Sequence, residues 1–327
     1  MTAPPLRIVV LSNPAASGHR GEAEAAPPGL RRLVLEGPAR LPAQYAEAVR
    51  DGCDLVVIDG GDGTVRQAAG AMLEAPGEPP AIAILARGNS NLVARRFGGL
   101  STLEELRGLD RAELARRAIP RPVMRVERDG AAPEHGFILG WGAYAAGTRI
   151  AQAEIAERGA GGVWRGVLST LRRALFGAEA RALRAGAAAR IRVDGAPLPD
   201  GPRFVGLATV LPMPLFPGLA PVWGEGAGPL GWLDVAAPPK RLWLAAPLAL
   251  LGRPTAWMKA AGHRSGRARA LELRVEGGLV LDGDALDPRG HETLRVTADR
   301  RLRFLAGGGA FAGASTPPVV PAPRNGL

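Results

Sequence analysis

The residues of this chain best suited to chemistry stand in Asp54–Thr64, where an apolar run ends in a glycine-rich turn. Val56–Ile58 is typical of a buried strand, and the glycines that follow, Gly60, Gly61 and Gly63, let the backbone turn sharply and approach a ligand closely. A strand, a glycine turn and a helix start together direct backbone N–H groups and a positive dipole end toward an anion. The pattern predicts a phosphate site.

One carboxylate, Asp62, stands within this turn, and Thr64 behind it is expected to cap the next helix. Phosphates repel a carboxylate unless it holds a metal ion or takes a proton from the attacking group. Asp62 therefore favours phosphoryl transfer over phosphate binding alone. The plain alternative is a tight turn with a capping aspartate, which needs fewer glycines than this chain provides.

Three more segments carry polar residues at turns between predicted elements. They are Asn13-Pro14 with Ser17 after the first strand, Gly88-Asn89-Ser90-Asn91 after a later strand, and Asp282-Gly283-Asp284 near the end. Each has a plain alternative: a strand-end turn, a helix-capping loop and a hairpin turn. Asp194-Gly195 echoes the last of them, and both Asp-Gly pairs are compatible with hairpin turns.

The chain lacks the residues that several other catalytic mechanisms require. No lysine precedes Lys240, so a Walker-type phosphate loop has no lysine, and no Gly-x-Ser-x-Gly elbow for a serine hydrolase is present. The Asp62 turn does not have the Gly-x-Gly-x-x-Gly spacing of dinucleotide-binding turns. The single cysteine, Cys53, excludes an internal disulfide, and four dispersed histidines give no zinc spacing.

Length and composition predict a globular protein of two domains. The chain has 327 residues, is 46% apolar, and contains no apolar run long enough to span a membrane. The net charge of +10 is nearly all arginine, and no zinc finger or aromatic-basic signature indicates nucleic acid as a partner. The first residues lack a signal-peptide pattern, so we expect a cytoplasmic protein.

Strand and helix patterns alternate up to about residue 118, which predicts a doubly wound α/β domain over residues 1–120. The expected strands are Leu6–Leu11, Leu30–Leu35, Leu55–Ile58 and Ala81–Leu85. The expected helices are Pro42–Arg50, Val65–Glu74, one that starts with Leu92–Phe97, and a segment that ends near Ala118 after a Ser101–Glu104 capping box.

Short strand patterns between glycine and proline turns predict a β-rich domain over residues 121–306. The expected strands are Val123–Glu127, Ile191–Val193, Phe204–Val210, Trp232–Val235 and Leu271–Val275, with helical insertions at Val163–Phe176 and Leu242–Leu251. The Gly- and Pro-rich tail, residues 307–327, is expected to be disordered.

These motifs, in this order and spacing, resemble the diacylglycerol kinase catalytic-domain family. That family includes soluble bacterial lipid kinases and sphingosine kinases, and it shares its first domain's fold with NAD kinases. The resemblance implies an N-terminal α/β nucleotide-binding domain, a sandwich-like β-rich second domain, and an active site in the cleft between them. It also implies ATP and Mg²⁺ as cofactors, and a lipid substrate at the inner membrane surface, within lipid metabolism and phospholipid biosynthesis.

The resemblance assigns roles to the motif residues. Asp62 and Asp282 are the two candidates for the catalytic base, with Asp62 ranked first. The nucleotide-binding residues would be Asn13, Pro14, Ser17, Gly60, Gly61, Gly63, Thr64, Gly88, Asn89, Ser90, Asn91 and Asp284. The metal ligands stay open, and so does a homodimer.

Three acidic positions of the family are neutral in this chain. Leu92 replaces an aspartate after the second glycine loop, Gln67 replaces a glutamate behind Thr64, and Leu230 replaces an aspartate that binds a structural magnesium in some bacterial relatives. Two other readings therefore stand beside the lipid kinase. One is a kinase of a soluble nucleotide such as NAD, and the other is a non-catalytic nucleotide or lipid sensor.

Two further segments, one apolar with basic neighbours and one basic, each allow two interpretations. Leu242–Leu251 with Lys240, Arg241, Trp243 and Trp257 fits a membrane-touching face, but a packed amphipathic helix is the favoured interpretation. Arg95 and Arg96 fit a phosphate contact less well than a solvated helix face.

Overall fold

The computed structural model describes residues 5–16, 30–149, 169, 172, 176, 180–286 and 292–307. Three expectations lie outside these ranges. They are Ser17 of the first loop, all but isolated positions of the helix expected at Val163–Phe176, and the tail from residue 308 on.

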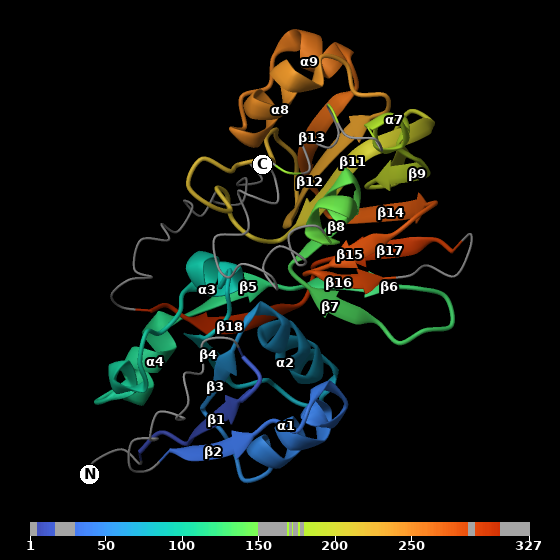
Figure 1. The fold of residues 1–327 in the computed structure, drawn as a ribbon. Helices are drawn as coiled ribbons and strands as arrows, with labels where there is room; N and C mark the ends of the chain where they lie inside the picture. Colours follow the sequence, from blue (N-terminus) through green and yellow to red (C-terminus); the bar gives the residue numbers. More distant parts are fainter. Residues whose placement is uncertain are drawn as a thin grey trace, which may run out of the picture.

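The first sheet has six strands in the order β2-β1-β3-β4-β18-β5 (Figure 1). Their bounds are β1 Ile8–Ser12, β2 Arg31–Val34, β3 Leu55–Gly60, β4 Ala81–Ala86, β5 Ala118–Pro122 and β18 Arg301–Leu305. All neighbours are parallel except β18 and β5. The last described strand of the chain, β18, thus returns to the first sheet and separates β4 from β5.

Helices cover both faces of this sheet, as a doubly wound fold requires. They are η1 Pro38–Arg40, α1 Leu41–Val49, α2 Asp62–Glu74, α3 Leu92–Phe97, η2 Leu103–Leu106 and α4 Arg111–Arg117. Successive residues of a strand point to opposite faces, so Val56 and Ile58 lie in one buried cluster and Leu55 and Val57 in another. The predicted α/β fold class is confirmed.

The second sheet is antiparallel and curled, in the order β16-β15-β8-β11-β9-β14-β17-β6-β7, with β10, β12 and β13 attached at its side. The bounds are β6 Met124–Glu127, β7 Glu134–Gly136, β8 Ile138–Gly142, β9 Ala187–Val193, β10 Ala196–Pro197, β11 Gly201–Thr209, β12 Leu230–Ala236, β13 His263–Ala268, β14 Ala270–Val275, β15 Leu279–Leu281, β16 Asp284–Leu286 and β17 Leu294–Thr297. The helices are α7 Ala180–Ala185, α8 Leu242–Leu250 and α9 Ala256–Ala260. The predicted β-rich second region is therefore confirmed.

Three phenylalanines join the two sheets. Phe97 of α3 lies 5.0 Å from Phe304 of β18 and 5.7 Å from Phe137, between ring centroids. All three side chains are buried. Phe137 connects β7 to β8, so this cluster fixes the start of β8 against the first sheet. The same backbone supplies a hydrogen-bond donor to the candidate site.

The capping box at the start of η2 lies one residue later than predicted. Thr102 is the N-cap of η2 and pairs reciprocally with Glu105, so Ser101 and Glu104 do not form the box. Glu104 and Glu105 are both acidic, and the S/T-x-x-E pattern fits both pairs in the sequence. The extended backbone of Thr102 decides between them.

Candidate active site

The predicted phosphate loops meet at one edge of the first sheet. β1, β3 and β4 run parallel, with Ser12 level with Asp59 and Gly60 level with Ala86. The carboxyl ends of these strands therefore place their three following loops side by side. In open α/β sheets, ligands bind at this edge.

Two glycines bring the turn after β3 against the loop after β4. A Cβ atom on Gly61 would lie 3.1 Å from Gly88 Cα, and one on Gly88 would lie 2.8 Å from Gly61 Cα. The N–H of Arg87 also donates to the carbonyl oxygen of Gly60 at 3.0 Å. Gly60, Gly61 and Gly63 all lack a positive φ. At Gly61 and Gly88, glycine is therefore needed for the close approach of two backbones and not for a left-handed backbone conformation.

The start of α2 has room for an anionic group. Gly61 is its N-cap, with no side chain bound there, and nothing lies within 4 Å of a Cβ atom built on Gly63. The helical hydrogen bonds begin with the N–H of Val65, which donates to Gly61 at 3.1 Å. The N–H groups before it are directed out of the helix end, as in helices that bind phosphate.

Thr64 does not cap α2, contrary to expectation. It lies inside the first turn, where its Oγ1 accepts a hydrogen bond from Asn13 Nδ2 at 2.8 Å. The backbone N–H of Asn13 donates to Asp59 at 2.9 Å. Asn13 therefore ties the loop after β1, which includes Pro14, to the turn after β3.

Asp62 caps a neighbouring helix. Its Oδ1 accepts the N–H of Val93 at 3.0 Å, and its Oδ2 accepts the N–H of Leu92 at 2.9 Å and the hydroxyl of Ser90. Leu92 and Val93 open α3, whose own N-cap residue, Asn91, makes no side-chain cap bond. Asp62 thus joins the starts of α2 and α3, and both of its carboxylate oxygens are engaged.

Asn91 shapes the loop after β4. Its backbone is left-handed, with φ 46°, and its Oδ1 accepts the N–H of Gly88 at 2.7 Å. This hydrogen bond closes a short loop that contains Asn89 and Ser90. Arg95 donates from Nε to the Ser90 carbonyl at 3.1 Å, so its guanidinium supports the loop from α3.

Asp59 is a buried charge that the motif reasoning missed. It is 1% exposed, accepts the Ser12 hydroxyl at 2.6 Å, and lies 3.4 Å from Arg87 Nε. It therefore links the ends of β1 and β3 to the loop after β4. The available signal was an acid at the end of an apolar run, one residue before the glycines.

Asp282 occupies the β15–β16 turn and faces inward. Its φ is 50°, followed by Gly283 at 100°, as in a hairpin turn. Its Oδ2 accepts the N–H of Phe137 and its Oδ1 the N–H of Ile138, both at 2.8 Å. A Cβ atom on Gly136 would lie 2.5 Å from Oδ2, so this glycine makes room for the carboxylate.

Burial raises the pKa of Asp282 to about 7. The two backbone donors and the charge of Arg66 lower the pKa, while the negative charge of Asp62 adds to the rise. The carboxylates of Asp62 and Asp282, from the two sheets, thus act on each other electrostatically. Strongly shifted groups of this kind cluster at functional sites.

Tyr144 is a neighbour of Asp282 that the sequence analysis did not single out. Burial raises the pKa of its hydroxyl, and the negative charge of Asp282 raises it further. A Cβ atom on Gly140 would lie 1.9 Å from the Tyr144 ring, so glycine on β8 lets the ring pack there. The phenol therefore remains protonated beside the Asp282 carboxylate at neutral pH.

Asp284 belongs to a chain of ion pairs. Arg66 of α2 binds the Asp284 carboxylate and lies 3.8 Å from Glu134, which in turn lies 2.6 Å from Arg128. The Arg66 side chain is only 13% exposed. The first sheet's α2 is therefore held to β7 and β16 of the second sheet, and Asp284 serves this contact.

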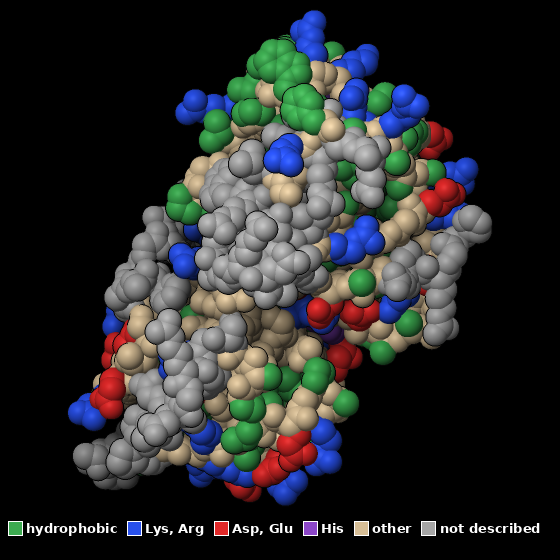
Figure 2. Space-filling view, viewed as in Figure 1, with side chains coloured by type: hydrophobic (Ala, Val, Ile, Leu, Met, Phe, Trp, Pro, Cys, Tyr) green, Lys and Arg blue, Asp and Glu red, His purple; other side chains and the backbone are tan. Residues whose placement is uncertain are grey.

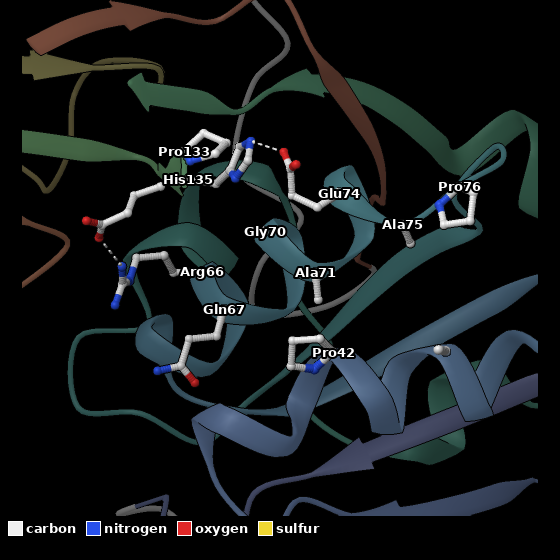
Figure 3. A pocket seen from close by; sticks show the side chains of 12 residues that line it. Pro42, Arg66, Gln67, Gly70, Ala71, Glu74, Ala75, Pro76, Pro133 and His135 are labelled. Carbon is white, nitrogen blue, oxygen red and sulfur yellow. Dashed lines mark ion pairs between the residues drawn. The ribbon is translucent and has the colours of Figure 1, made fainter. Parts of the chain in front are cut away.

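A cavity of about 410 Å³ lies along α2 next to this chain (Figure 3). Figure 3 shows side chains of α2 facing Pro42 of α1 and the segment before β7. The lining residues on α2 are Arg66, Gln67, Gly70, Ala71 and Glu74. With a helical repeat of 3.6 residues, they continue the stripe that starts at Asp62 and Gly63. Nε2 of the buried His135 closes one side, 3.5 Å from Glu74.

The described residues do not form a protein cage for magnesium. No group of three or more His, Cys, Asp or Glu side chains within them is placed to hold a metal ion. Leu230 is fully buried and apolar, so the structural magnesium of some relatives has no ligand there. The nearby Asp234 pairs instead with Arg203 Nε at 3.0 Å, and burial raises its pKa to about 6.

Comparison with solved structures shows the same fold in two bacterial proteins and finds a weaker match to a third protein. A diacylglycerol kinase from Bacillus anthracis str. Sterne is 14% identical, with a TM-score of 0.58 over 93% of this chain and 98% of that one. A candidate diacylglycerol kinase from the same strain is 16% identical, with a TM-score of 0.61 over the same shares. An NAD kinase from Archaeoglobus fulgidus in complex with ATP is 13% identical, with a TM-score of 0.45 over 91% and 93%.

No curated protein matches the chain. A family model does, however. Residues 7–123, which contain the Asn13 loop, the Asp62 turn and the Gly88–Asn91 loop, match the diacylglycerol kinase catalytic domain. The match supports a phosphotransferase of the kinase type. The resemblance that the motifs indicated is thereby confirmed: residues 7–123 are similar to the diacylglycerol kinase catalytic domain.

Proposed function

We propose that the protein is an ATP-dependent lipid kinase that transfers the γ-phosphate to a hydroxyl of a diacylglycerol-like or sphingoid lipid. The family match over residues 7–123 supports the kinase reaction. The observation that carries the proposal is the Asp282 carboxylate, which the N–H groups of Phe137 and Ile138 hold at 2.8 Å and whose pKa burial raises to about 7. A base with a pKa near the operating pH is effective in proton transfer.

The nucleotide would bind across the three loops at the edge of the first sheet. The open space at Gly63 and the N–H groups at the start of α2 suit the phosphates. Asn13 and Thr64, bonded to each other, would form one side, and the Gly88–Asn91 loop would form the other.

In the proposed reaction, Asp282 accepts the proton of the lipid hydroxyl as that oxygen forms a bond to the γ-phosphorus. The bond between the γ-phosphorus and the oxygen bridging to the β-phosphate breaks, and ADP leaves. Asp282 later releases its proton to water. The two backbone donors orient the carboxylate, and the neutral Tyr144 beside it adds no charge.

This assignment reverses the ranking made from the motifs. Asp62 was the first candidate for the base, but it is Asp282 whose pKa burial raises to about 7, whereas Asp62 bonds to α3 and the loop before it. We propose that Asp62 positions the two loops, and that Asp282 takes the proton. Magnesium would reach the site with the phosphates of the nucleotide, the usual way this ion enters kinase sites.

A non-catalytic sensor of nucleotide or lipid is the second candidate. Gln67, Leu92 and Leu230 are neutral where relatives carry acids, and Asp62 is engaged in helix capping. The fold would then be kept for binding while the reaction is lost.

One assay separates the candidates. Purified protein is incubated with labelled ATP, with and without magnesium, and with a panel of diacylglycerol, monoacylglycerol, sphingoid base, ceramide, undecaprenol and NAD. We expect label to transfer to one of the lipids. Transfer to NAD alone would identify a kinase of a soluble nucleotide, and ATP binding without any transfer would identify the sensor.

A further inference from the structure

The helix α8 is apolar on all sides although it lies on the surface. Its sequence, Leu-Trp-Leu-Ala-Ala-Pro-Leu-Ala-Leu, contains no polar residue, and only Leu242 and Ala245 are buried. Trp243 is 66% exposed, Leu244 37% and Leu251 just beyond the helix 48%. A helix packed on a core would turn these side chains inward. The favoured sequence interpretation, a packed amphipathic helix, does not describe this element.

Cations surround this helix. Residues 238–270 contain seven Lys and Arg and no Asp or Glu. The only two lysines of the whole chain, Lys240 and Lys259, are among them, and both are exposed together with Arg241 and Arg253. Figure 2 shows hydrophobic side chains gathered over α8 and α9 at the top of the molecule, with Lys and Arg side chains around them. We call Trp243, Leu244, Pro247 and Leu251 with these four cations the α8 surface.

The helix α9 holds the α8 surface in place. The Arg241 guanidinium lies 5.8 Å from the centroid of the Trp257 ring, which joins the start of α8 to α9. Met258 of α9 is fully buried, so α9 is anchored in the core. The exposed apolar side chains of α8 are therefore held in place by α9, which is packed into the core.

We infer that the α8 surface docks on an anionic lipid membrane. Tryptophan and leucine enter the boundary between headgroups and acyl chains, while lysine and arginine contact lipid phosphates. The described helices include none that is long and apolar enough to cross a membrane, and α8 has nine residues. The helix would therefore lie in the plane of the interface.

A second copy of the chain fits this surface less well. A two-fold symmetric contact places the same patch of both copies together. The cations of one α8 surface would then face those of the other, with no acid in the segment to pair with them. An anionic lipid surface has the complementary charge.

The inference rests on the proposed function in one respect only: a lipid kinase would take its substrate from the membrane on which the α8 surface docks. The predicted catalytic and nucleotide-binding residues lie outside α8 and α9, so docking and catalysis are separable. Vesicle binding can be measured whether or not the protein is a kinase.

The test is cosedimentation of the full chain with vesicles. Vesicles of phosphatidylcholine with phosphatidylglycerol should bind the protein, pure phosphatidylcholine should not, and salt should weaken the binding. The pairs Trp243→Ala with Leu244→Ala, and Lys240→Gln with Lys259→Gln, should each reduce binding by about tenfold. Val34→Ala, also at an exposed apolar residue, and Arg50→Gln, at an exposed arginine, are matched controls on the first sheet and α1 and should bind normally.

Equal binding to neutral and anionic vesicles, or unchanged binding of both pairs, would overturn the inference. A different pair of results would also overturn it: the unmodified protein binds no vesicles and is a dimer in light scattering, while the variant with Trp243→Ala and Leu244→Ala is a monomer. A second copy of the chain would then be the partner of the α8 surface. Phosphorylation of a short-chain, water-soluble diacylglycerol separates the two proposals. If no lipid is phosphorylated while anionic vesicles are bound through α8, the kinase proposal fails and docking stands.

Discussion

The carboxylate of Asp62, the first residue of α2, accepts the backbone N–H of Val93 in α3 at 3.0 Å. A second bond from Leu92 at 2.9 Å makes this side chain the cap of α3, supplied by another helix. Asp62 therefore sets the distance between the turn after β3 and the loop after β4. Under the proposed function, this structural role of Asp62 leaves the role of the base to Asp282.

Asp62→Ala should lower both stability and nucleotide binding. The substitution removes three hydrogen bonds to a charged acceptor and leaves two N–H groups without their partner, at a cost of about 2 kcal/mol in the free energy of unfolding. The loops would then separate, so ATP affinity should fall as well. Chemical denaturation and ATP titration measure the two effects.

Asp110→Ala is the matched control. Asp110 caps α4 through the N–H of Glu113 at 2.7 Å, away from the phosphate loops. It should cost about 1 kcal/mol of stability and leave ATP affinity unchanged. An Asp62→Ala protein of normal stability that still binds ATP but has lost phosphotransfer would restore Asp62 as the base.

Gly63→Ala should weaken ATP binding without harming the fold. Its Cβ atom would meet nothing within 4 Å, and alanine is favoured over glycine in a helix by about 0.5–1 kcal/mol. The thermal midpoint should therefore be unchanged or raised. A methyl group at this place would enter the space proposed for phosphate, so the dissociation constant for ATP should rise.

Gly88→Ala gives the contrasting result. Its Cβ atom would lie 2.8 Å from Gly61 Cα, a backbone atom that cannot move aside alone. Both the thermal midpoint and ATP affinity should therefore fall. If Gly63→Ala leaves ATP affinity unchanged in the same titration, the phosphates do not bind at the start of α2.

Local patterns sufficed for much of this fold. The start of α3 at Leu92 was predicted, and the apolar runs indicated β3 and β4 to within one or two residues, because buried parallel strands carry continuous apolar side chains. The three loops were predicted from strand ends and glycines. These features depend on neighbours in the sequence.

Long-range pairing was not predictable in the same way. β18 has an alternating pattern typical of a half-buried strand, and nothing local indicates that it inserts between β4 and β5. The hydrogen bonds that occupy Asp62 come from residues 28 to 31 positions away. Tyr144 and Gly136 gain their significance only from the position of Asp282, more than 130 residues later.

His135 should make the fold sensitive to acid. Burial lowers its pKa below the ordinary value of 6.5, although the charge of Glu74 opposes this shift. The unfolded chain therefore binds the proton first, and the contribution of His135 to stability, present above about 6.5, is lost as the pH falls through its lower folded pKa. His135→Gln should flatten the dependence of unfolding free energy on pH between about 7 and 5. A variant with the same slope as the unmodified protein would contradict this prediction.

Asp282→Asn should abolish phosphotransfer while the protein still folds and binds ATP. Asparagine keeps the size of the side chain but cannot accept a proton, so turnover should fall by at least about a hundredfold. With a pKa of about 7, Asp282 is ionised only above neutrality, and kcat/KM of the unmodified protein should rise through pH 7 and then level off. Because its pKa is raised in the folded protein, Asp282 makes the protein less stable as the pH rises, whereas kcat/KM increases over the same pH range. The contribution of Asp282 to the unfolding free energy is fully present below the ordinary value of 3.8 and is lost as the pH rises to about 7.

Asp194→Asn is the matched control for this prediction. Asp194 occupies the same kind of turn, with φ 49° against 50° for Asp282, and its Oδ1 accepts the N–H groups of Arg269 and Ala270. It lies between β9 and β10, where no predicted site residue is found. Its replacement should leave the pH profile of kcat/KM unchanged. If the Asp282→Asn protein retains both activity and the rise through pH 7, the proton goes to another group and the assignment of the base is wrong.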